Sequence, residues 1–196
     1  MEPKPLGRRK VIGGLSPLRA KPAAPAAEAA GESSGAAKLP FRIGHGYDIH
    51  RLQSGGKLPI GGVIVSEEIS PVSHSDGDVV IHAIVDALLG AMGWGDIGEH
   101  FSDADDQWKG AASRVFLETI YARVTKSGYK LHNLDVTLLA EKPKISPHKL
   151  KIVESLRHLF GGAGAINLKA CTNEGCDAVG RGEAIAANAV LLLAAE

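Results

Sequence analysis

From residue 41 onward, the spacing of hydrophobic residues switches between that of a β-strand and that of a helix. Within residues 41–50 they fall mainly on every second position, which is the period of a β-strand, and a second extended run covers residues 58–65. Gly55 and Gly56 lie between the two runs. Two strand-like runs on either side of a glycine turn predict a β-hairpin.

Three later stretches repeat apolar residues every three to four positions, which is the spacing of one helix face. They predict helices over residues 79–92, 112–127 and 147–160. Residues 134–140 and 166–171 are strand-like, whereas the apolar stretch 185–195 has no period that separates a helix from a buried strand. This alternating order predicts an α/β or α+β sandwich, in which helices are layered on a sheet.

Composition separates residues 1–40 from the rest of the chain. This segment holds nine alanines and six of the ten prolines, and its Lys and Arg outnumber its Asp and Glu by seven to three. The segment has few larger apolar side chains that could be buried in a core, which predicts a disordered basic extension. The alternative is an organelle-targeting segment, because a start rich in Arg, Lys and Ala also suits one. Residues 41–196 are then one domain with a single core.

Charge and composition also exclude several kinds of partner. The chain carries 22 Lys and Arg against 22 Asp and Glu, and aromatic residues make up only 5%. The sequence therefore offers neither a basic field nor a stacking platform for nucleic acid. No apolar run reaches the roughly 18 residues of a membrane-spanning helix, and two cysteines cannot build a disulfide framework. We expect no nucleic-acid partner and no membrane partner.

A candidate metal site combines residues from the first strand and the first helix. Asp48 and His50 lie two positions apart, so that their side chains project from the same face of a strand. His82 lies in the first turns of the helix over 79–92. An Asp-His-His set with one open position is typical of catalytic zinc, although a strand-end cap and an ordinary helix histidine explain the same residues. Asp78 and Asp86 flank His82 at helical spacing, either as a solvated acidic face or as groups that orient a ligating imidazole.

Residues 74–78 precede the same helix and suit phosphate binding. Free amides at a helix N-terminus attract anions, Ser75 adds a hydroxyl, and His74 adds a further donor. Simple helix capping accounts for Ser75 but leaves His74 unexplained.

Two further groups of polar residues fall in loops. Residues 96–98 and 101–105 carry several aspartates beside glycine, which suit either sugar hydroxyls or plain turns. After the strand 166–171 come a hydroxyl, a carboxylate and a guanidinium, of which Glu174 suits a hard cation such as Mg²⁺ and Arg181 suits a phosphate.

Taken in order, these motifs resemble the 2-C-methyl-D-erythritol 2,4-cyclodiphosphate synthase family in its monofunctional form. The resemblance extends from residue 41 to the C-terminus and is carried by residues 42–50, 74–78, 82, 86–90, 95–98 and 180–183. It implies a mixed four-stranded sheet with helices on one face, a ferredoxin-like arrangement, and a homotrimer with active sites between neighbouring subunits. It also implies that 185–195 is a strand buried on both faces.

The resemblance implies the function and the role of each site residue. The reaction closes 4-diphosphocytidyl-2-C-methyl-D-erythritol 2-phosphate to the 2,4-cyclodiphosphate and releases CMP. Asp48, His50 and His82 would bind Zn²⁺ or another divalent ion, and Glu174 would help to hold Mg²⁺ or Mn²⁺ on the diphosphate. His74 and Thr172 would align the phosphates in the transition state. The remaining substrate contacts would be Ser75, Asp96, Ile97, Gly98, Phe101, Asp103, Asp105, Ala140, Lys144, Ile145, Ser146, Cys171, Asn173, Ala178 and Arg181.

The chain departs from the family pattern at three positions, and two other functions compete. Cys171 stands where many relatives have Thr, Ala178 replaces an aromatic residue, and Ser102 replaces a common proline. A zinc hydrolase would use the same Asp-His-His set with bound hydroxide, but the sequence offers no separate carboxylate with a clear general-base role. A non-catalytic nucleotide-binding module would keep residues 140–146 and tolerate loss of the metal ligands. For location we expect a bacterial cytoplasm, with the plastid stroma as the alternative.

Overall fold

The computed structural model describes residues 39–102 and 104–196. The predictions for an extension over residues 1–40 therefore fall almost entirely outside the described residues, and so does the contact predicted for Asp103. Within the described residues, no helix has both the length and the apolar character needed to span a bilayer.

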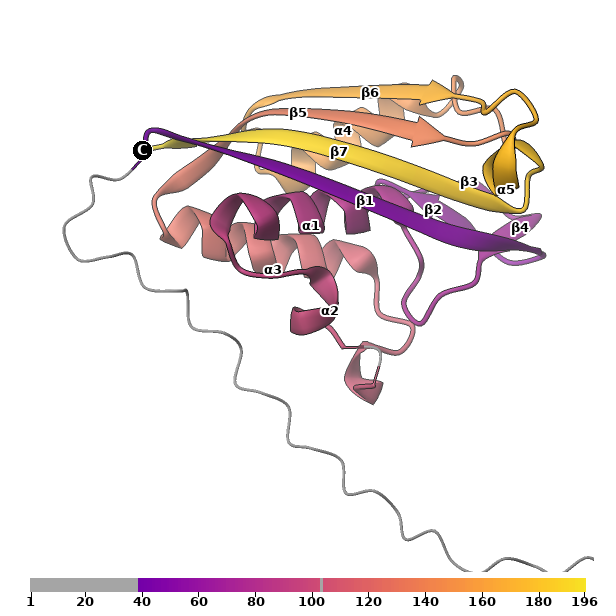
Figure 1. Cartoon of the computed structure of the whole chain (residues 1–196), viewed down its shortest axis with the longest axis horizontal. Coiled ribbons are helices and arrows are strands. Elements are labelled where there is room, and N and C mark those ends of the chain that lie inside the picture. The colour runs from indigo at the N-terminus through magenta and orange to yellow at the C-terminus, as the bar shows by residue number, and fades with distance from the viewer. Residues whose placement is uncertain (1–38, 103) are drawn as a thin grey trace, which may run out of the picture.

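A mixed sheet forms one layer of the molecule (Figure 1), with strand order β4-β1-β7-β5-β6. Its members are β1 (Phe41–Ser54), β4 (Ile69–Pro71), β5 (Tyr129–Leu139), β6 (Ala165–Cys171) and β7 (Ala184–Ala195). β7 runs antiparallel to both β1 and β5, whereas β5 and β6 are parallel. The predicted mixed sheet is confirmed, but it has five strands rather than four because the short β4 pairs with the end of β1.

Helices cover one face of this sheet (Figure 1). The three long ones are α1 (Val79–Met92), α3 (Ser113–Lys126) and α4 (Lys149–Leu159), and the short ones are α2 (Ile97–His100) and the 3₁₀ turn η1 (Asp106–Trp108). The four-residue α5 (Asp177–Gly180) packs on the other face, where Val179 contacts Ala184 and Ala186 of β7. All three predicted helices are present, within two residues at each end. The sandwich of helices on a sheet is therefore confirmed.

The predicted hairpin between residues 41–50 and 58–65 is wrong. β1 pairs with β7 along residues 41–51, while β2 (Leu58–Ile60) and β3 (Val63–Ser66) pair with each other as a separate two-stranded sheet. Gly61 and Gly62, both with positive φ, form the turn between β2 and β3. The short strands β2 and β3 thus pair with each other, and the long β1 pairs with the C-terminal β7.

The chain order of the elements also differs from the ferredoxin-like arrangement. The long strands and helices follow the order β1, α1, α3, β5, α4, β6, β7, whereas a ferredoxin-like fold has the order β-α-β-β-α-β. What the two share is the split β-α-β unit, in which β7 lies between the parallel strands β1 and β5. The stretch 185–195, ambiguous by period, is strand β7 because it pairs on both sides.

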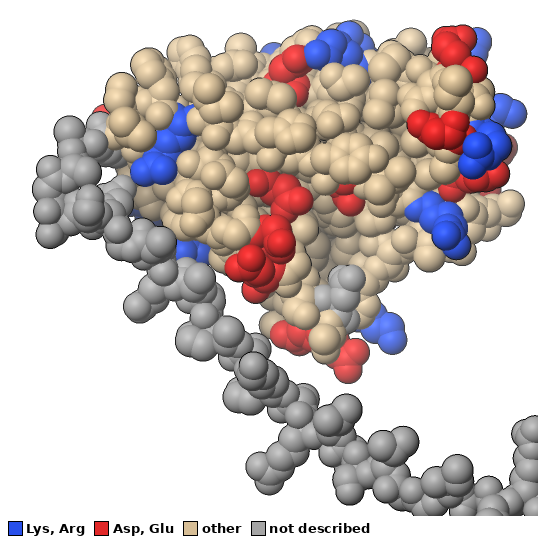
Figure 2. All heavy atoms as spheres, viewed as in Figure 1, with Lys and Arg blue, Asp and Glu red and all other residues tan. Residues whose placement is uncertain are grey.

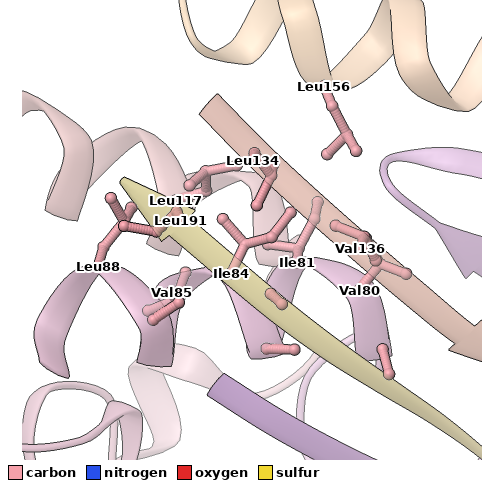
Figure 3. Close-up of a cluster of buried hydrophobic side chains, with 14 of the residues drawn as sticks. Val80, Ile81, Ile84, Val85, Leu88, Leu117, Leu134, Val136, Leu156 and Leu191 are labelled. Atoms are coloured by element: carbon pink, nitrogen blue, oxygen red, sulfur yellow. The ribbon is translucent and has the colours of Figure 1, made fainter. Parts of the chain in front are cut away.

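Helix α1 forms the centre of the core between the sheet and the other helices. Figure 3 shows its side chains Val80, Ile84 and Leu88 among apolar residues of α3, β5 and β7. Nine-tenths or more of each of these side chains is buried, which removes a large apolar area from water. The position of α1 against β1 follows from this packing, and it places His82 beside the strand that carries Asp48 and His50.

A buried carboxylate ties the start of α1 to the β2–β3 turn. Asp78 is fully buried and caps α1 by accepting a hydrogen bond from Ile81 N at 3.1 Å. Its two oxygens also accept from Gly61 N at 2.9 Å and from Gly62 N at 2.7 Å. Two buried backbone donors, Gly61 and Ile81, and the exposed Gly62 therefore depend on one side chain.

We expect Asp78→Ala to lower the free energy of unfolding by about 2 to 4 kcal/mol, because a lost cap and the unsatisfied buried N–H group of Gly61 add up, while the exposed Gly62 loses less. Asp78→Asn, which keeps one acceptor oxygen, should lose less. Urea unfolding followed by circular dichroism measures both. The exposed Asp106 is the matched control, and its alanine variant should stay within about 0.5 kcal/mol of the parent. An Asp78→Ala variant as stable as the Asp106 variant would contradict this role.

Candidate metal centre and active site

Asp48, His50 and His82 converge on one point between β1 and α1. Asp48 Oδ2 lies 2.9 Å from His50 Nε2 and 3.0 Å from His82 Nδ1, and the two ring nitrogens are 3.0 Å apart. The strand places the first two side chains on its helix-facing side, and the first turn of α1 supplies the third. The predicted convergence of these three residues is confirmed.

The geometry and chemistry of the three groups fit a divalent metal ion. Zinc binds imidazole nitrogen and carboxylate oxygen at about 2.0 to 2.2 Å, and three donor atoms about 3 Å apart can surround one ion at such distances. One carboxylate and two imidazoles are borderline ligands that suit zinc among other transition metals. The three side chains retain 10 to 23% of their exposure, so that one side of the site stays open to a further ligand.

The electrostatics of the cluster favour a charged carboxylate. Burial disfavours the ionised form of Asp48, but hydrogen bonds and charge interactions with His50 and His82 outweigh it and hold the pKa of Asp48 well below its usual range. For His82, burial lowers the pKa, while the hydrogen bond and charge of Asp48 raise it more, so that the net shift is upward. A metal ion at this site would therefore compete with a proton for the imidazole of His82.

A pocket of about 420 Å³ opens on the three ligands. Five further predicted site residues line it: His74, Ser75, Ile97, Gly98 and Phe101. Within the described residues, the buried Nε2 of His74 has no hydrogen-bond partner. A buried polar atom of this kind, beside a metal-ligand set, indicates a donor available to a bound ligand.

Acidic side chains gather over α1 and α2 beside this pocket, as Figure 2 shows. Asp96 and Glu99 lie on α2, where the carboxylate of Asp96 accepts a hydrogen bond from Glu99 N at 3.0 Å. Asp105 similarly caps η1 by accepting from Gln107 N. Neither Asp96 nor Asp105 lines the pocket, so that the structure places both in the capping and turn role that was the alternative prediction. A phosphate near this acidic surface would require cations to offset repulsion.

The other predicted site residues form a second group at the C-terminal ends of β5 and β6. Ala140 N donates to Cys171 O at 3.0 Å, and Asn173 N donates to the Glu141 carboxylate at 3.0 Å. Thr172 Oγ1 donates to Glu174 Oε1 at 2.8 Å. These contacts join the segment that begins at Ala140 to the loop after β6, apart from the metal pocket.

The predicted residues around this second group differ in exposure. Lys144 and Ser146 are exposed, Ile145 is buried, and the exposed thiol of Cys171 points to Leu138 O at 3.9 Å. Arg181 pairs with Glu183 through two hydrogen bonds of 3.0 and 3.1 Å. A larger cavity of about 800 Å³ lies at the end of β1 and is lined by Ala178, Glu183 and a mixture of apolar and polar residues that includes Arg51 and Gln53. It contains none of the three metal ligands.

Comparison with known proteins identifies the family. The model of the YgbB family matches residues 41–194, which is most of the chain. This chain belongs to the YgbB family.

Curated YgbB relatives come from plants and from bacteria. "2-C-methyl-D-erythritol 2,4-cyclodiphosphate synthase, chloroplastic" of Arabidopsis thaliana is 49% identical over 156 residues, which cover 79% of this chain and 68% of the relative. The protein of Vibrio vulnificus strain YJ016 named "2-C-methyl-D-erythritol 2,4-cyclodiphosphate synthase" is 50% identical over 154 residues, or 78% of this chain and 98% of the relative.

Similar structures include the Plasmodium falciparum "IspF CDP complex", with a TM-score of 0.72 and 32% identity over 82% of this chain and 99% of that one. The "Bifunctional IspDF from Campylobacter jejuni" has a TM-score of 0.76 and 34% identity, covering 80% of this chain and 42% of that one. These relatives share the fold of the present chain.

The structure corrects one prediction about this YgbB chain. Asp78 and Asp86 were candidates for orienting a ligating imidazole, but Asp78 accepts from three backbone groups and Asp86 accepts from Ile97 N at 2.8 Å. Two other residues, Ser113 and Ser75, instead reach His82. Ser113 Oγ lies 2.8 Å from His82 Nε2, and Ser113 is in turn bound to Asp76.

Sequence reasoning did not find Ser113. The only local signal was its position at the start of the predicted helix 112–127, where serine is a common cap residue. Its contact with His82 spans 31 residues of the chain. Such a contact depends on how α3 packs against α1, which no local pattern reports.

Proposed function

We propose that this chain converts 4-diphosphocytidyl-2-C-methyl-D-erythritol 2-phosphate into 2-C-methyl-D-erythritol 2,4-cyclodiphosphate and CMP. It is a phosphorus–oxygen lyase of the methylerythritol phosphate route to isoprenoids. The observation that carries the proposal is the convergence of Asp48, His50 and His82 in an open pocket of a YgbB-family chain. Its curated relatives, 49% and 50% identical, bear the name of that synthase.

The reaction joins two anionic parts of one substrate. An oxygen of the 2-phosphate attacks the β-phosphorus of the diphosphate, the bond from that phosphorus to the α-phosphate oxygen breaks, and CMP leaves with that oxygen. No water is consumed. Because the nucleophile is already an ionised phosphate oxygen, the reaction needs little proton transfer. The protein must fold the substrate back on itself, hold the attack in line and reduce the repulsion between anions.

The residues of the metal pocket suit these tasks. Asp48, His50 and His82 would hold a divalent ion, which we propose is zinc. When bound, such an ion polarises a phosphoryl oxygen and offsets its charge. His74 and Ser75 line the same pocket, and within the described residues the buried Nε2 of His74 has no hydrogen-bond partner. These groups would donate hydrogen bonds to phosphate oxygens and keep the diphosphate in one orientation.

The second group of predicted residues, at the C-terminal ends of β5 and β6, would hold the nucleotide end of the substrate. Residues 140–146 would surround cytidine, and Thr172 would donate to a phosphate. Glu174 is exposed in the loop after β6, and one oxygen of its carboxylate accepts a hydrogen bond from Thr172 at 2.8 Å. We propose that it helps to hold Mg²⁺ or Mn²⁺ on the diphosphate. The acidic surface beside the pocket repels the negative charge of the diphosphate. Two cations bound to the diphosphate would offset that charge.

A homotrimer would bring the two groups together. Within the described residues, the pocket at the metal ligands contains none of Lys144, Thr172 and Glu174, so that one copy lacks a complete substrate site around its metal. The sheet face opposite the helices exposes apolar side chains, namely Phe41, Ile43, Tyr47, Ile49 and Val190 at 45 to 73%. An apolar surface of this kind favours burial against another copy. Neighbouring copies would then each supply one group to a shared site.

Phosphorus NMR of the purified protein with the cytidyl substrate tests the proposal. The expected result is a cyclic diphosphate together with CMP. A hydrolysed linear product would indicate a zinc hydrolase instead, and unchanged substrate with tightly bound CMP would indicate a nucleotide-binding module.

We expect a chelator to abolish this turnover, because the charge of the phosphates is then no longer offset. Adding back Zn²⁺ together with Mg²⁺ should restore most of the initial rate of CMP release. Adding back each ion alone shows how much of the rate depends on its site. Turnover that survives exhaustive chelation, with metal analysis showing an ion-free protein, would contradict the metal role.

The cellular location remains a prediction of a bacterial cytoplasm, with the plastid stroma as the alternative. The curated relatives include plant proteins named as chloroplastic as well as bacterial proteins. Mass spectrometry of the native N-terminus distinguishes the two, because a plastid-targeting segment would be cleaved from the mature protein.

A further inference from the structure

The two ring nitrogens of His82 face different surroundings. Nδ1 points to the metal centre, at 3.0 Å from both Asp48 Oδ2 and His50 Nε2. Nε2 points the other way and lies 2.8 Å from Ser113 Oγ and 3.1 Å from Ser75 Oγ. Ser113 is fully buried at the first position of α3. The orientation of its hydroxyl therefore affects which nitrogen of the imidazole carries the proton.

Asp76 determines that orientation. Its Oδ2 accepts from Ser113 N at 3.0 Å, and its Oδ1 accepts from Asp78 N at 3.2 Å and is in short contact with Ser113 Oγ. An ionised carboxylate can only accept. The hydroxyl hydrogen of Ser113 must then point to Asp76, so that its oxygen lone pair faces His82 Nε2.

We propose that Asp76 and Ser113 are positioning residues that hold His82 as the tautomer with hydrogen on Nε2. A neutral imidazole carries one N–H, so that a proton held on Nε2 leaves the lone pair of Nδ1 for a metal ion. This inference rests on the metal site of the proposed function and adds two residues to it. Its test, however, needs no substrate.

The opposite tautomer would close the metal site. With hydrogen on Nδ1, His82 would donate to Asp48 Oδ2, 3.0 Å away, and tie up two of the three ligands. The Asp76–Ser113 pair opposes this tautomer, because it provides an acceptor, Ser113 Oγ, for a hydrogen on Nε2. Ser75 cannot do the same, because within the described residues its hydroxyl has no carboxylate partner; it accepts from Gly77 N at 3.3 Å and lies 3.4 Å from Ser73 Oγ. Its hydrogen is free to rotate toward or away from the ring.

A serine between carboxylate and imidazole has a further physical effect. In a direct carboxylate–histidine pair the negative charge makes the imidazole more basic. Here the hydroxyl separates the two groups, so that Asp76 orients the ring while adding little charge to it. Asp48 then remains the one anionic ligand among the three residues of the cluster.

Zinc affinity of the purified protein, measured by competition with a chromophoric chelator, tests the proposal. We expect Ser113→Ala and Asp76→Asn each to weaken Zn²⁺ binding by about 10- to 100-fold, as loss of outer partners of a ligating histidine does. Ser113→Thr keeps the hydroxyl and should recover most of the affinity. Thr119→Ala removes an exposed hydroxyl on the same helix and should leave the affinity unchanged. Melting curves of all four variants separate loss of metal from loss of fold.

Proton NMR of the unaltered, zinc-loaded protein gives a second readout that requires no variant to fold. We expect a slowly exchanging imidazole N–H resonance from His82, because its Nε2 is enclosed by the buried Ser113. This signal should be missing or in fast exchange in Ser113→Ala. Unchanged Zn²⁺ affinity in both Ser113→Ala and Asp76→Asn, or a rapidly exchanging N–H in the unaltered protein, would overturn the proposal. A protein that binds zinc as expected but makes no cyclic diphosphate would refute the proposed function and leave this inference standing.

Discussion

We expect replacement of His82 with alanine to lower the rate of CMP release by about 10³-fold or more while the fold stays in place. The reason is that His82 Nδ1 is one of three donor atoms that converge within 3.0 Å of one another. Two ligands hold a divalent ion far less tightly than three, and without the ion the repulsion between the reacting phosphates is not offset. Initial rates of CMP release and the zinc content of the dialysed protein measure the effect together.

Two comparisons make this result specific for the metal site. His158 is an exposed histidine on α4, and its alanine variant should keep both zinc and activity. His82→Asn fills more of the buried space than alanine does, and it should also lose activity although it packs better. Near-normal CMP release from a zinc-free His82→Ala protein that retains its circular dichroism spectrum would remove the metal assignment.

Gly46→Ala should destabilise the fold by about 3 kcal/mol or more and weaken zinc binding at the same time. A Cβ at Gly46 would lie 2.0 Å from Ala83 O and 2.7 Å from Ala87 N, both backbone atoms of α1. Backbone atoms in a packed helix cannot move aside singly, so that β1 and α1 must separate. Because β1 carries Asp48 and His50 while α1 carries His82, this separation also pulls the ligands apart.

Thermal unfolding and zinc affinity of Gly46→Ala measure both parts of this expectation. Gly90→Ala is the matched control, since it adds the same methyl group to α1 where the nearest atom is 3.8 Å away. Alanine is the better helix former, so that this control should be about 0.5 to 1 kcal/mol more stable than the parent. A Gly46→Ala protein with the stability and zinc affinity of the control would show that the close approach of β1 and α1 is not required.

Local patterns predicted the elements well where their partners did not matter. The helix over 79–92 coincides with α1, because its apolar spacing and its cap residue Asp78 act within one element. Strand pairing depended on distant residues, and there prediction failed. The run 58–65 turned back on itself at Gly61 and Gly62, while β1 paired with a strand more than 130 residues later in the chain. The fifth strand, β4, is only three residues long and has no periodicity to detect.

For the candidate site, too, the sequence predicted what lies within one element, and tertiary packing decided what lies between elements. The spacing of Asp48 and His50 alone placed both side chains on one face of a strand, because that alternation is a property of the extended backbone. Only the packing of α1 on β1 decided that His82 meets them, and only the packing of α3 on α1 brought Ser113 to the far side of its ring. Sequence spacing determines which side chains of one helix or strand point in the same direction. The distances between elements, on which ligand sets and hydrogen-bond relays depend, result from the apolar contacts that pack them.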